Sequence, residues 1–238
     1  MSGRGHGPIT VECVAQRIHS NDVGRQSRMK LYSDPRSPNC CKVLFAAALL
    51  GLELEVENFD LTQGPHRTAK FRDLNPNCKV PVLVDGDFVL WESNAILQYL
   101  CSMAGSGGAS ILPTEARLNA DTMRWLFWSS EEWKTAVRPY LWERIVKPIF
   151  GIGAPDSQVL AAAEPPFLQA LEILDRHLAG RQYLVCERLT LADIGVSSYL
   201  VYARQAQLPL AGARHVRAWL ERIQGSPAWQ HSHADSLV

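Results

Sequence analysis

The residues Ser37 to Cys40 read S-P-N-C, which is the spacing of a redox dithiol motif with serine in place of the first cysteine. A two-thiol redox site needs a nucleophilic cysteine at that first position, so the sequence excludes a dithiol oxidoreductase. The motif lies between a strand-like run and a helix-like run, which places it at a helix N-terminus. Ser37 is therefore either an ordinary helix cap or a hydroxyl that serves a different chemistry.

A second candidate is the run K-V-P-V-L-V-D, which begins at Lys79 and carries Pro81 at the start of a strand. Within a thioredoxin-like fold, a proline in this place is typically cis. It would present the backbone N–H and C=O of Val80 outward, where an extended peptide can pair with them as an added strand. An ordinary strand-initiating proline is the alternative.

A third candidate lies at the turn into the next helix, where Glu92 and Ser93 stand side by side. Ser93 is expected to cap that helix or to present its backbone N–H, an arrangement that suits a carboxylate, although capping alone is the alternative. His66 lies in a polar loop and would be solvated if it acted alone. Together with Lys79 and the Val80 backbone, these residues would surround a short peptide with charged ends.

The elements that must position these residues follow from periodicity and turn signals. The predicted order is strand, helix, strand, short helix, strand, strand, helix, over residues 29–33, 38–51, 53–59, 64–76, the hairpin 80–93 and 93–104. The first half needs a crossover and the second half closes as a hairpin, so the four-stranded sheet is expected to be mixed. This is a thioredoxin-like α/β arrangement, and residues 29–104 are predicted to form that domain.

The remainder of the chain is predicted to be all helical. Residues 105–114 are rich in glycine and serine and are expected to be a linker, so residues 115–238 form the helical domain. Residues 115–146 are expected to form one bent helix or two helices, with Pro139 as the break, and the pair Pro165–Pro166 is expected to delay the start of the next one. Thr190 and Asp193 have the spacing of a helix capping box.

Composition limits the function further. Lys plus Arg equals 24 and Asp plus Glu equals 24, a balance that argues against a nucleic-acid-binding face. No apolar run reaches the length of a membrane span. The six cysteines are scattered without metal-ligand spacing, so no metal site is expected and a reducing, cytoplasmic location is favoured. Residues 1–28 are interpreted as a flexible extension, in which a short helix over 11–18 is not expected to pack.

Four motifs together resemble the cytosolic glutathione S-transferase family: S-P-N-C-C-K-V, N-P-N-C-K-V-P-V-L, E-S-N-A-I-L-Q-Y-L and L-T-L-A-D-I. Residues 29–104 resemble the N-terminal domain of that family, and residues 115–231 look like its helical domain. The similarity is greatest to bacterial, serine-type members related to the theta and nu classes. One departure is Cys78, which occupies a turn position that is commonly glycine and would be strained there.

The resemblance implies a site for glutathione, the cosubstrate; no permanently bound cofactor is implied. Ser37 would donate a hydrogen bond to the glutathione sulfur and stabilise its thiolate, with Asn39 as a second donor. Cys40 and Cys41 are expected to be buried helix residues, although a reactive thiol at this helix end is the alternative. The glutathione-binding positions carried over from the family are His66, Lys79, Val80, Pro81, Glu92 and Ser93.

The resemblance also implies an enzyme that adds the glutathione thiolate to a small hydrophobic electrophile, as in detoxification, and that forms a homodimer. Trp128, Trp133 and Arg138 are the residues expected to line the electrophile pocket. One alternative is a nu-like glutathione-dependent disulfide reductase, whose partner is a disulfide. Another is a non-catalytic transferase-like module that recruits a partner protein. The sequence leaves the electrophile open.

Overall fold

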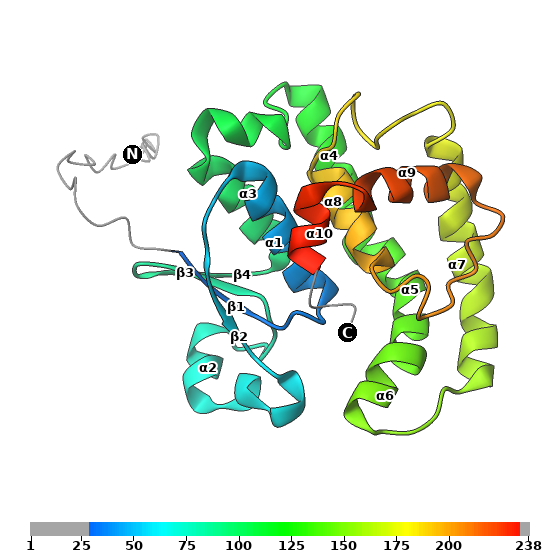
Figure 1. The fold of residues 1–238 in the computed structure, drawn as a ribbon, viewed down its shortest axis with the longest axis horizontal. Helices are drawn as coiled ribbons and strands as arrows, with labels where there is room; N and C mark the ends of the chain where they lie inside the picture. Colours follow the sequence, from blue (N-terminus) through cyan, green and yellow to red (C-terminus); the bar gives the residue numbers. More distant parts are fainter. Residues whose placement is uncertain (1–28, 234–238) are drawn as a thin grey trace, which may run out of the picture.

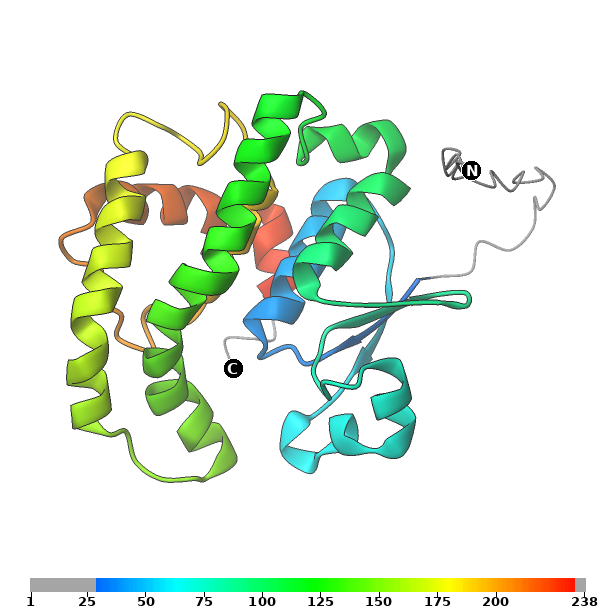
Figure 2. The ribbon, with the colours of Figure 1, turned by 180° about the vertical axis from the view of Figure 1, so that it is seen from behind.

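The computed structural model describes residues 29–233 of the 238-residue chain. The interpretation of residues 1–28 as an extension lies outside the described residues. Figure 1 shows a sheet with helices on both faces beside a larger group of helices, and Figure 2 shows the same arrangement from behind. The predicted fold class, a thioredoxin-like domain joined to an all-helical domain, is confirmed.

The sheet is mixed, as predicted, with the strand order β2-β1-β3-β4. Its strands are β1 Lys30–Ser33, β2 Glu55–Asn58, β3 Val82–Asp85 and β4 Phe88–Trp91. β1 pairs with β2 in parallel, whereas β3 is antiparallel to both β1 and β4. Leu31 and Leu83 are cross-strand partners with no exposed surface, so they form the centre of the sheet's buried face.

Two helices cover one face of the sheet and a short one covers the other (Figure 1). The first two are α1 Pro38–Leu50 and α3 Ser93–Met103; the short one is α2 Ala69–Leu74, which follows the 3-10 turns η1 Leu61–Gln63 and η2 Pro65–Arg67. α1 packs against α3 on one side and against α8 and α10 of the helical domain on the other. A helix between two domains must be apolar nearly all round, and α1 is.

The helical domain is built around one long helical rod. The rod consists of α4 Ala116–Trp128, η4 Ser129–Trp133, α5 Lys134–Leu141, η5 Trp142–Val146 and α6 Lys147–Phe150. It follows the 3-10 segment η3 Gly105–Ser110, within the residues predicted as a linker. The remaining elements are α7 Ser157–His177, α8 Leu191–Ser197, η6 Ser198–Leu200, α9 Arg214–Gln224 and α10 Pro227–His233.

Pro139 does not break the rod, so of the two predicted forms the division into two helices at this residue is wrong. It lies inside α5, and the two segments that flank α5, η4 and η5, are π-helical turns. A proline cannot donate a backbone hydrogen bond to the carbonyl four residues earlier. The π-helical turns η4 and η5 change which residues are hydrogen-bonded along the rod, so the rod continues past the missing bond.

The prolines at positions 165 and 166 also lie inside a helix, contrary to the prediction. α7 begins earlier, because the Asp156 carboxylate accepts hydrogen bonds from the backbone N–H groups of Gln158 and Val159. Both prolines are exposed, and so are Ala161 and Ala162, whose carbonyls lose their helical partners. Water can satisfy those carbonyls, so the helix tolerates the pair.

The predicted capping box at Thr190 and Asp193 is confirmed. Asp193 also contacts residues outside the helix that it caps. The buried Asp193 carboxylate accepts from the Thr190 N–H and hydroxyl at 2.9 and 3.0 Å. It also accepts from the Leu184 N–H and from the Trp219 indole, each at 2.9 Å. One side chain thus joins the start of α8 to the preceding loop and to α9.

We expect Asp193→Ala to lower the free energy of unfolding by about 3 kcal/mol or more, because several buried donors lose their acceptor together. Urea denaturation followed by circular dichroism measures this loss. Asp156→Ala, which removes an exposed helix cap, is the matched control and should cost only about 1 kcal/mol. Equal losses in the two variants would contradict the role assigned to Asp193.

Candidate active site

The predicted site residues come from segments that meet at one end of the sheet. The strand register pairs Tyr32 with Val82 and Val82 with Trp91, so the end of β1, the start of β3 and the end of β4 lie together. β1 and β2 also end side by side. Loops leaving this edge carry Ser37 and His66, while Pro81 and Glu92 flank the hairpin directly. The topology therefore gathers residues that are far apart in the sequence.

Ser37 occupies the N-cap position of α1, but its side chain makes no capping hydrogen bond. Its backbone carbonyl accepts from the N–H groups of Cys40 and Cys41 at 2.9 and 3.0 Å, and its own N–H donates to the Asp34 carbonyl at 2.9 Å. The backbone of Ser37 is thus held firmly by its neighbours. Its hydroxyl is not used to cap the helix, which disfavours the simple-cap interpretation.

Ser37 lines a cavity of about 270 Å³ between the two domains. One side of the cavity is the loop from β1 to α1, and the opposite side is the end of the helical rod. The rod contributes five apolar side chains: Leu141, Ile145, Val146, Ile149 and Phe150. The cavity thus sets one hydroxyl opposite a wall that suits an apolar molecule.

An ion-pair cluster holds the loop that carries Ser37. The Asp34 carboxylate, 2% exposed, accepts from the Arg36 backbone N–H at 2.8 Å and from its guanidinium at 2.9 and 2.7 Å. Arg36 also donates to Asp60 at 2.7 Å. Hydrogen bonds from Thr62 and Arg36 lower the pKa of Asp60 to about 2. The Arg36 charge is therefore engaged by two carboxylates beside the cavity.

Tyr202 ties this loop to the helical domain. Its hydroxyl donates to the Arg36 carbonyl at 2.9 Å, and its ring also lines the cavity. Burial, with the nearby Cys41 and Asp34, raises the pKa of Tyr202, so the phenol stays neutral and keeps its proton to donate. A residue of the helical domain thus fixes the backbone immediately before Ser37.

Asn39 is held by two hydroxyl groups from different parts of the chain. Its Oδ1 accepts from the Ser93 hydroxyl at 3.3 Å and from the Tyr199 hydroxyl at 3.1 Å. Burial and the charge of Glu92 raise the pKa of Tyr199, so this phenol also remains a donor. With Oδ1 occupied, the amide NH₂ is the part of Asn39 that can donate to a ligand.

Of the two roles expected for Ser93, that of capping α3 is wrong. Glu92, not Ser93, is the N-cap residue, and its exposed side chain makes no capping hydrogen bond. Glu92 also has a φ of 73°, which is unusual for a residue other than glycine. Ser93 is the first helical residue and donates its hydroxyl to Asn39 instead. The Glu92 carboxylate is therefore exposed to solvent at this edge of the sheet.

The peptide bond between Val80 and Pro81 is cis, as predicted. Cys78 has a φ of 52°, so the expected strain in this turn is also confirmed. The buried Asn75 holds the turn, because its amide donates to the Lys79 carbonyl at 2.7 Å while its Oδ1 accepts from the Asn77 N–H at 3.0 Å. The Lys79 side chain is exposed. Val80 comes next and forms the cis bond with Pro81, the residue immediately before β3.

His66 lies in η2, partly buried. Its Nδ1 is buried and has no hydrogen-bond partner among the described residues. Burial and the neighbouring charge of Arg67 lower the pKa of His66, although Asp34 acts in the opposite direction. The lowered pKa favours the neutral imidazole, whose Nδ1 is an unused polar atom.

Cys40 and Cys41 are both buried, as the sequence predicts. The Cys40 sulfur accepts from the Asp34 N–H at 3.5 Å, and burial raises the pKa of this thiol to about 11. The Cys41 thiol donates to the Pro35 carbonyl at 3.2 Å. A thiol with so high a pKa carries almost no thiolate at neutral pH, so the reactive-thiol alternative fails for Cys40.

The residues predicted for the electrophile pocket do not line the Ser37 cavity. Trp133 is a core residue with no exposed surface; its indole donates to the Val196 carbonyl at 3.1 Å and its ring stacks against Trp128. Trp128 itself borders a groove between the rod and α7, and Arg138 borders another groove on the exposed side of the rod. Helical spacing alone does not reveal which face of the rod meets the other domain.

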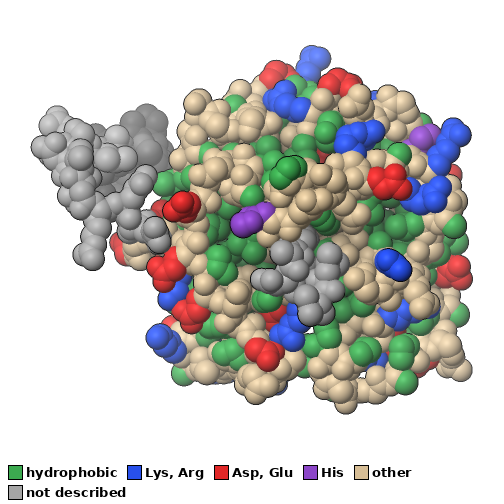
Figure 3. All heavy atoms as spheres, in the orientation of Figure 1, with side chains coloured by type: hydrophobic (Ala, Val, Ile, Leu, Met, Phe, Trp, Pro, Cys, Tyr) green, Lys and Arg blue, Asp and Glu red, His purple; other side chains and the backbone are tan. Residues whose placement is uncertain are grey.

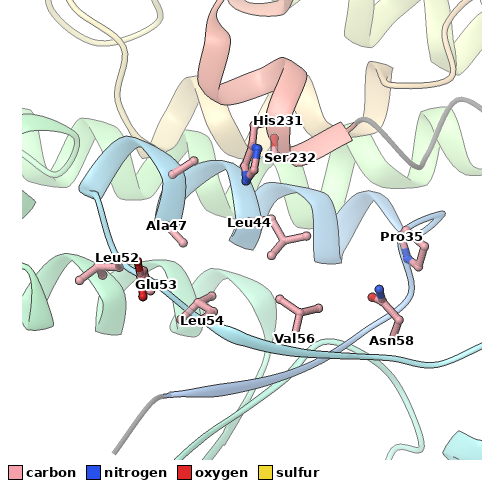
Figure 4. A pocket seen from close by; sticks show the side chains of 11 residues that line it. Pro35, Leu44, Ala47, Leu52, Glu53, Leu54, Val56, Asn58, His231 and Ser232 are labelled. Carbon is pink, nitrogen blue, oxygen red and sulfur yellow. The ribbon is translucent and has the colours of Figure 1, made fainter. Parts of the chain in front are cut away.

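A larger cavity, about 490 Å³, lies away from this site. It is bounded by α1, β2 and α10, and Figure 4 shows Leu44 and Val56 facing it together with His231. None of the residues predicted to act on glutathione lines it. The chemistry suggested by Ser37 therefore belongs to the smaller interdomain cavity.

On the face drawn in Figure 3, acidic and basic side chains both occur, without an extended field of one sign. Within residues 29–233, no helix is long and apolar enough to cross a membrane.

Two family models match the chain. The model described as "Glutathione S-transferase, N-terminal domain" matches residues 27–102, and the one described as "Glutathione S-transferase, C-terminal domain" matches residues 157–222. Their order along the chain agrees with the sheet domain followed by the helical domain.

Individual proteins agree with the family models. Glutathione S-transferase 3 of Zea mays is 37% identical over 209 residues, which cover 87% of this chain and 93% of that protein. The structure of glutathione S-transferase III in its apo form has a TM-score of 0.79 at 36% identity and covers 89% of this chain and 98% of that one. A theta-class enzyme of Xanthomonas axonopodis pv. citri with glutathione bound has a TM-score of 0.80 at 28% identity, covering 88% and 99%. The chain therefore belongs to the cytosolic glutathione S-transferase family and is a glutathione-conjugating enzyme.

Proposed function

We propose that Ser37 activates glutathione by donating a hydrogen bond to its sulfur. The observation that carries this proposal is a serine hydroxyl at the N-terminus of α1 that makes no capping bond and belongs to a residue lining an interdomain cavity. A thiol with a pKa near 8.5 is mostly protonated at pH 7. A hydroxyl donor and the positive end of a thirteen-residue helix both favour the thiolate. The amide of Asn39 is the second donor in this proposal.

The other ends of glutathione are assigned to the neighbouring loops. In this assignment Glu92 and Ser93 hold the γ-glutamyl end, where Glu92 meets the ligand's ammonium group and the first turn of α3 meets its carboxylate. The backbone of Val80, turned by the cis bond to Pro81, pairs with the cysteinyl unit. His66 and Lys79 address the glycine carboxylate.

The electrophile is proposed to occupy the cavity beside Ser37. Its walls from the rod are aliphatic or aromatic, and the charged groups that line it, Asp34 and Arg36, are paired with each other. A small apolar electrophile buries its surface there within reach of the sulfur. The reaction joins the thiolate sulfur to the electrophilic atom, while the electron pair passes to a leaving group or to an acceptor atom that is then protonated.

Several finer assignments remain our proposals. These are the serine-type, theta- and nu-like subclass, a bacterial origin, a cytoplasmic location and residues 29–104, 105–114 and 115–238 as domain limits. Conjugation is favoured over glutathione-dependent disulfide reduction and over a non-catalytic module by the relatives described above. The five cysteines within the described residues form no disulfide with one another, in keeping with the proposed location.

We expect Ser37→Ala to raise the pKa of bound glutathione by about 1 to 2 units, because the thiolate loses its nearest donor. The ultraviolet absorbance of the thiolate, titrated against pH in the complex, measures this directly. The rate of conjugation at pH 6.5 should fall by about 10- to 100-fold in the same variant.

Asn39→Ala is the comparison for this experiment, and Cys101→Ala is the control, since its buried thiol lies in α3 and should leave the bound pKa unchanged. Glutathione that binds with the same pKa in wild type and Ser37→Ala would refute the role of Ser37. If the pKa of bound glutathione rises only in Asn39→Ala, the Asn39 amide and not Ser37 stabilises the thiolate.

We expect Ile149→Asp to raise the KM for an apolar electrophile by about tenfold, because a charge would lie in the apolar wall of the cavity. The KM for glutathione should stay nearly constant. Ile152→Asp is the matched control, because Ile152 is exposed, lies three residues further on and does not line the cavity. Equal effects in both variants would show that the electrophile binds elsewhere.

We propose that the enzyme is a homodimer. Large apolar side chains are exposed on β4, α3 and α4, namely Phe88, Trp91, Met103 and Phe127, which are 39–68% exposed. Light scattering during size exclusion should give twice the chain mass of 26.5 kDa, and Phe127→Lys should shift the population toward the monomer. Ile173→Lys, on α7, is the control for a general effect of surface charge. A monomer at all concentrations would refute this proposal.

A further inference from the structure

Lys42 is a buried cation in α1 whose charge is weakly compensated. Lys42 is 1% exposed, although lysine is almost never fully buried unless its charge is paired. The ammonium donates to Asn94 Oδ1 at 2.7 Å and lies 5.7 Å from the centre of the Tyr199 ring. No carboxylate forms a salt bridge with it among the residues that the structure describes. An amide dipole and an aromatic face are what compensate its charge there.

The amide that meets Lys42 is held in one orientation. The Asn94 NH₂ group donates to the Leu126 carbonyl at 3.2 Å and to the Ser130 hydroxyl at 2.9 Å. Its Oδ1 must therefore face the ammonium. Since Leu126 and Ser130 belong to the helical rod, Lys42 lies where α1, α3 and the rod converge.

Lys42 is also part of a ring of contacts that includes the proposed γ-glutamyl position. Asn39 and Lys42 are three residues apart and share one face of α1. Asn39 accepts from both Ser93 and Tyr199, and the ring of Tyr199 faces Lys42. Ser93 and Asn94 are the first two residues of α3. The Lys42 ammonium therefore contacts the first turn of α3, the turn to which the ligand's carboxylate is assigned.

The groups that face Lys42 come from every neighbouring element. Burial is the main cause that lowers its pKa, to about 7, and the charge of Lys134 on α5 acts in the same direction. Glu92, before α3, and the Cys40 thiol in α1 act in the opposite direction. Tyr199 stays a neutral phenol because its own pKa is raised. Near neutral pH the empty site therefore holds a mixture of charged and neutral Lys42.

We propose that Lys42 is a positioning residue for the γ-glutamyl end of glutathione, a buried ammonium whose counter-charge is supplied by the ligand's carboxylate at the first turn of α3. This inference rests on the proposed function, which supplies the ligand and its orientation. The carboxylate would favour the charged form of Lys42, because an opposite charge nearby stabilises an ammonium in a low-dielectric environment.

The consequence is a proton taken up on binding. In the complex the pKa of Lys42 rises above its value in the free enzyme, so the ligand binds best to the protonated enzyme. Affinity should be full below about pH 7 and should fall as the pH rises toward the pKa of the complex. The thiol of glutathione releases a proton, which would mask this uptake, so the probe is S-methylglutathione, which has no thiol.

The test is calorimetric titration of the full-length enzyme with S-methylglutathione at pH 7.5 in buffers of different ionisation enthalpy. We expect wild type to take up roughly half a proton per ligand. Lys42→Arg, whose charge is permanent, should bind within a few-fold of wild type with no uptake. Lys42→Met should bind about tenfold more weakly, also with no uptake. His66→Gln should retain the uptake, because His66 is the other group proposed beside the ligand that could gain a proton.

Binding without proton uptake in wild type would overturn the role of Lys42 and leave the proposed function intact. Uptake that disappears in His66→Gln but persists in Lys42→Arg would assign the proton to the histidine and would also overturn it. Failure of S-methylglutathione to bind wild type would refute the proposed function, and the present inference with it. Because wild type and Lys42→Arg together decide between these outcomes, the test stays decisive even if Lys42→Met does not fold.

Discussion

The carboxylate of Asp193 is the single interaction on which the geometry of the site depends most. Four donors reach it from the N-cap residue of α8, from the loop before that residue and from α9, and the carboxylate itself is buried. A buried carboxylate is tolerated only when its hydrogen-bond donors are in place. These bonds therefore fix the segment that begins at Thr190 relative to the preceding loop and to α9. That segment continues directly into η6 and the turn after it, which carry Tyr199 and Tyr202. The capping box therefore sets where these two phenols lie.

The two tyrosines transmit that position to the N-terminus of α1. Tyr199 holds the side chain of Asn39 and Tyr202 holds the carbonyl of Arg36, one on each side of Ser37. The helical domain thus supplies more than a wall for the electrophile, because it also orients the residues proposed to activate the thiol. A hydroxyl that stabilises a thiolate must be held within a fraction of an ångström and a few tens of degrees of its productive position. Hydrogen bonds from a separately anchored domain provide that constraint.

Local signals made the sheet domain predictable. The antiparallel β3–β4 pair, the cis bond before Pro81 and the strain at Cys78 follow from a hairpin turn, a proline and a missing glycine, each of which acts over a few residues. The contacts of Tyr199 and Tyr202 depend instead on which face of a distant helix meets α1, and no local pattern encodes that rotation. The assignment of Trp133 to the pocket fails for the same reason, since a helical spacing of aromatic residues does not distinguish the core from a cavity wall.

Locally unfavourable features gather around the edge of the sheet where glutathione is proposed to bind. Cys78 and Glu92 have positive φ angles on either side of the β3–β4 hairpin, and Lys42 buries an ammonium behind the start of α3. Each of these lowers the stability of the empty enzyme, and the surrounding structure holds them in place through Asn75 and Asn94. A ligand with charged ends at both sides of a central thiol can relieve part of this cost on binding, because it brings the missing counter-charge and backbone partners. The same features that make the empty site unfavourable thus favour the bound one, which links the stability of this domain to the affinity of its site.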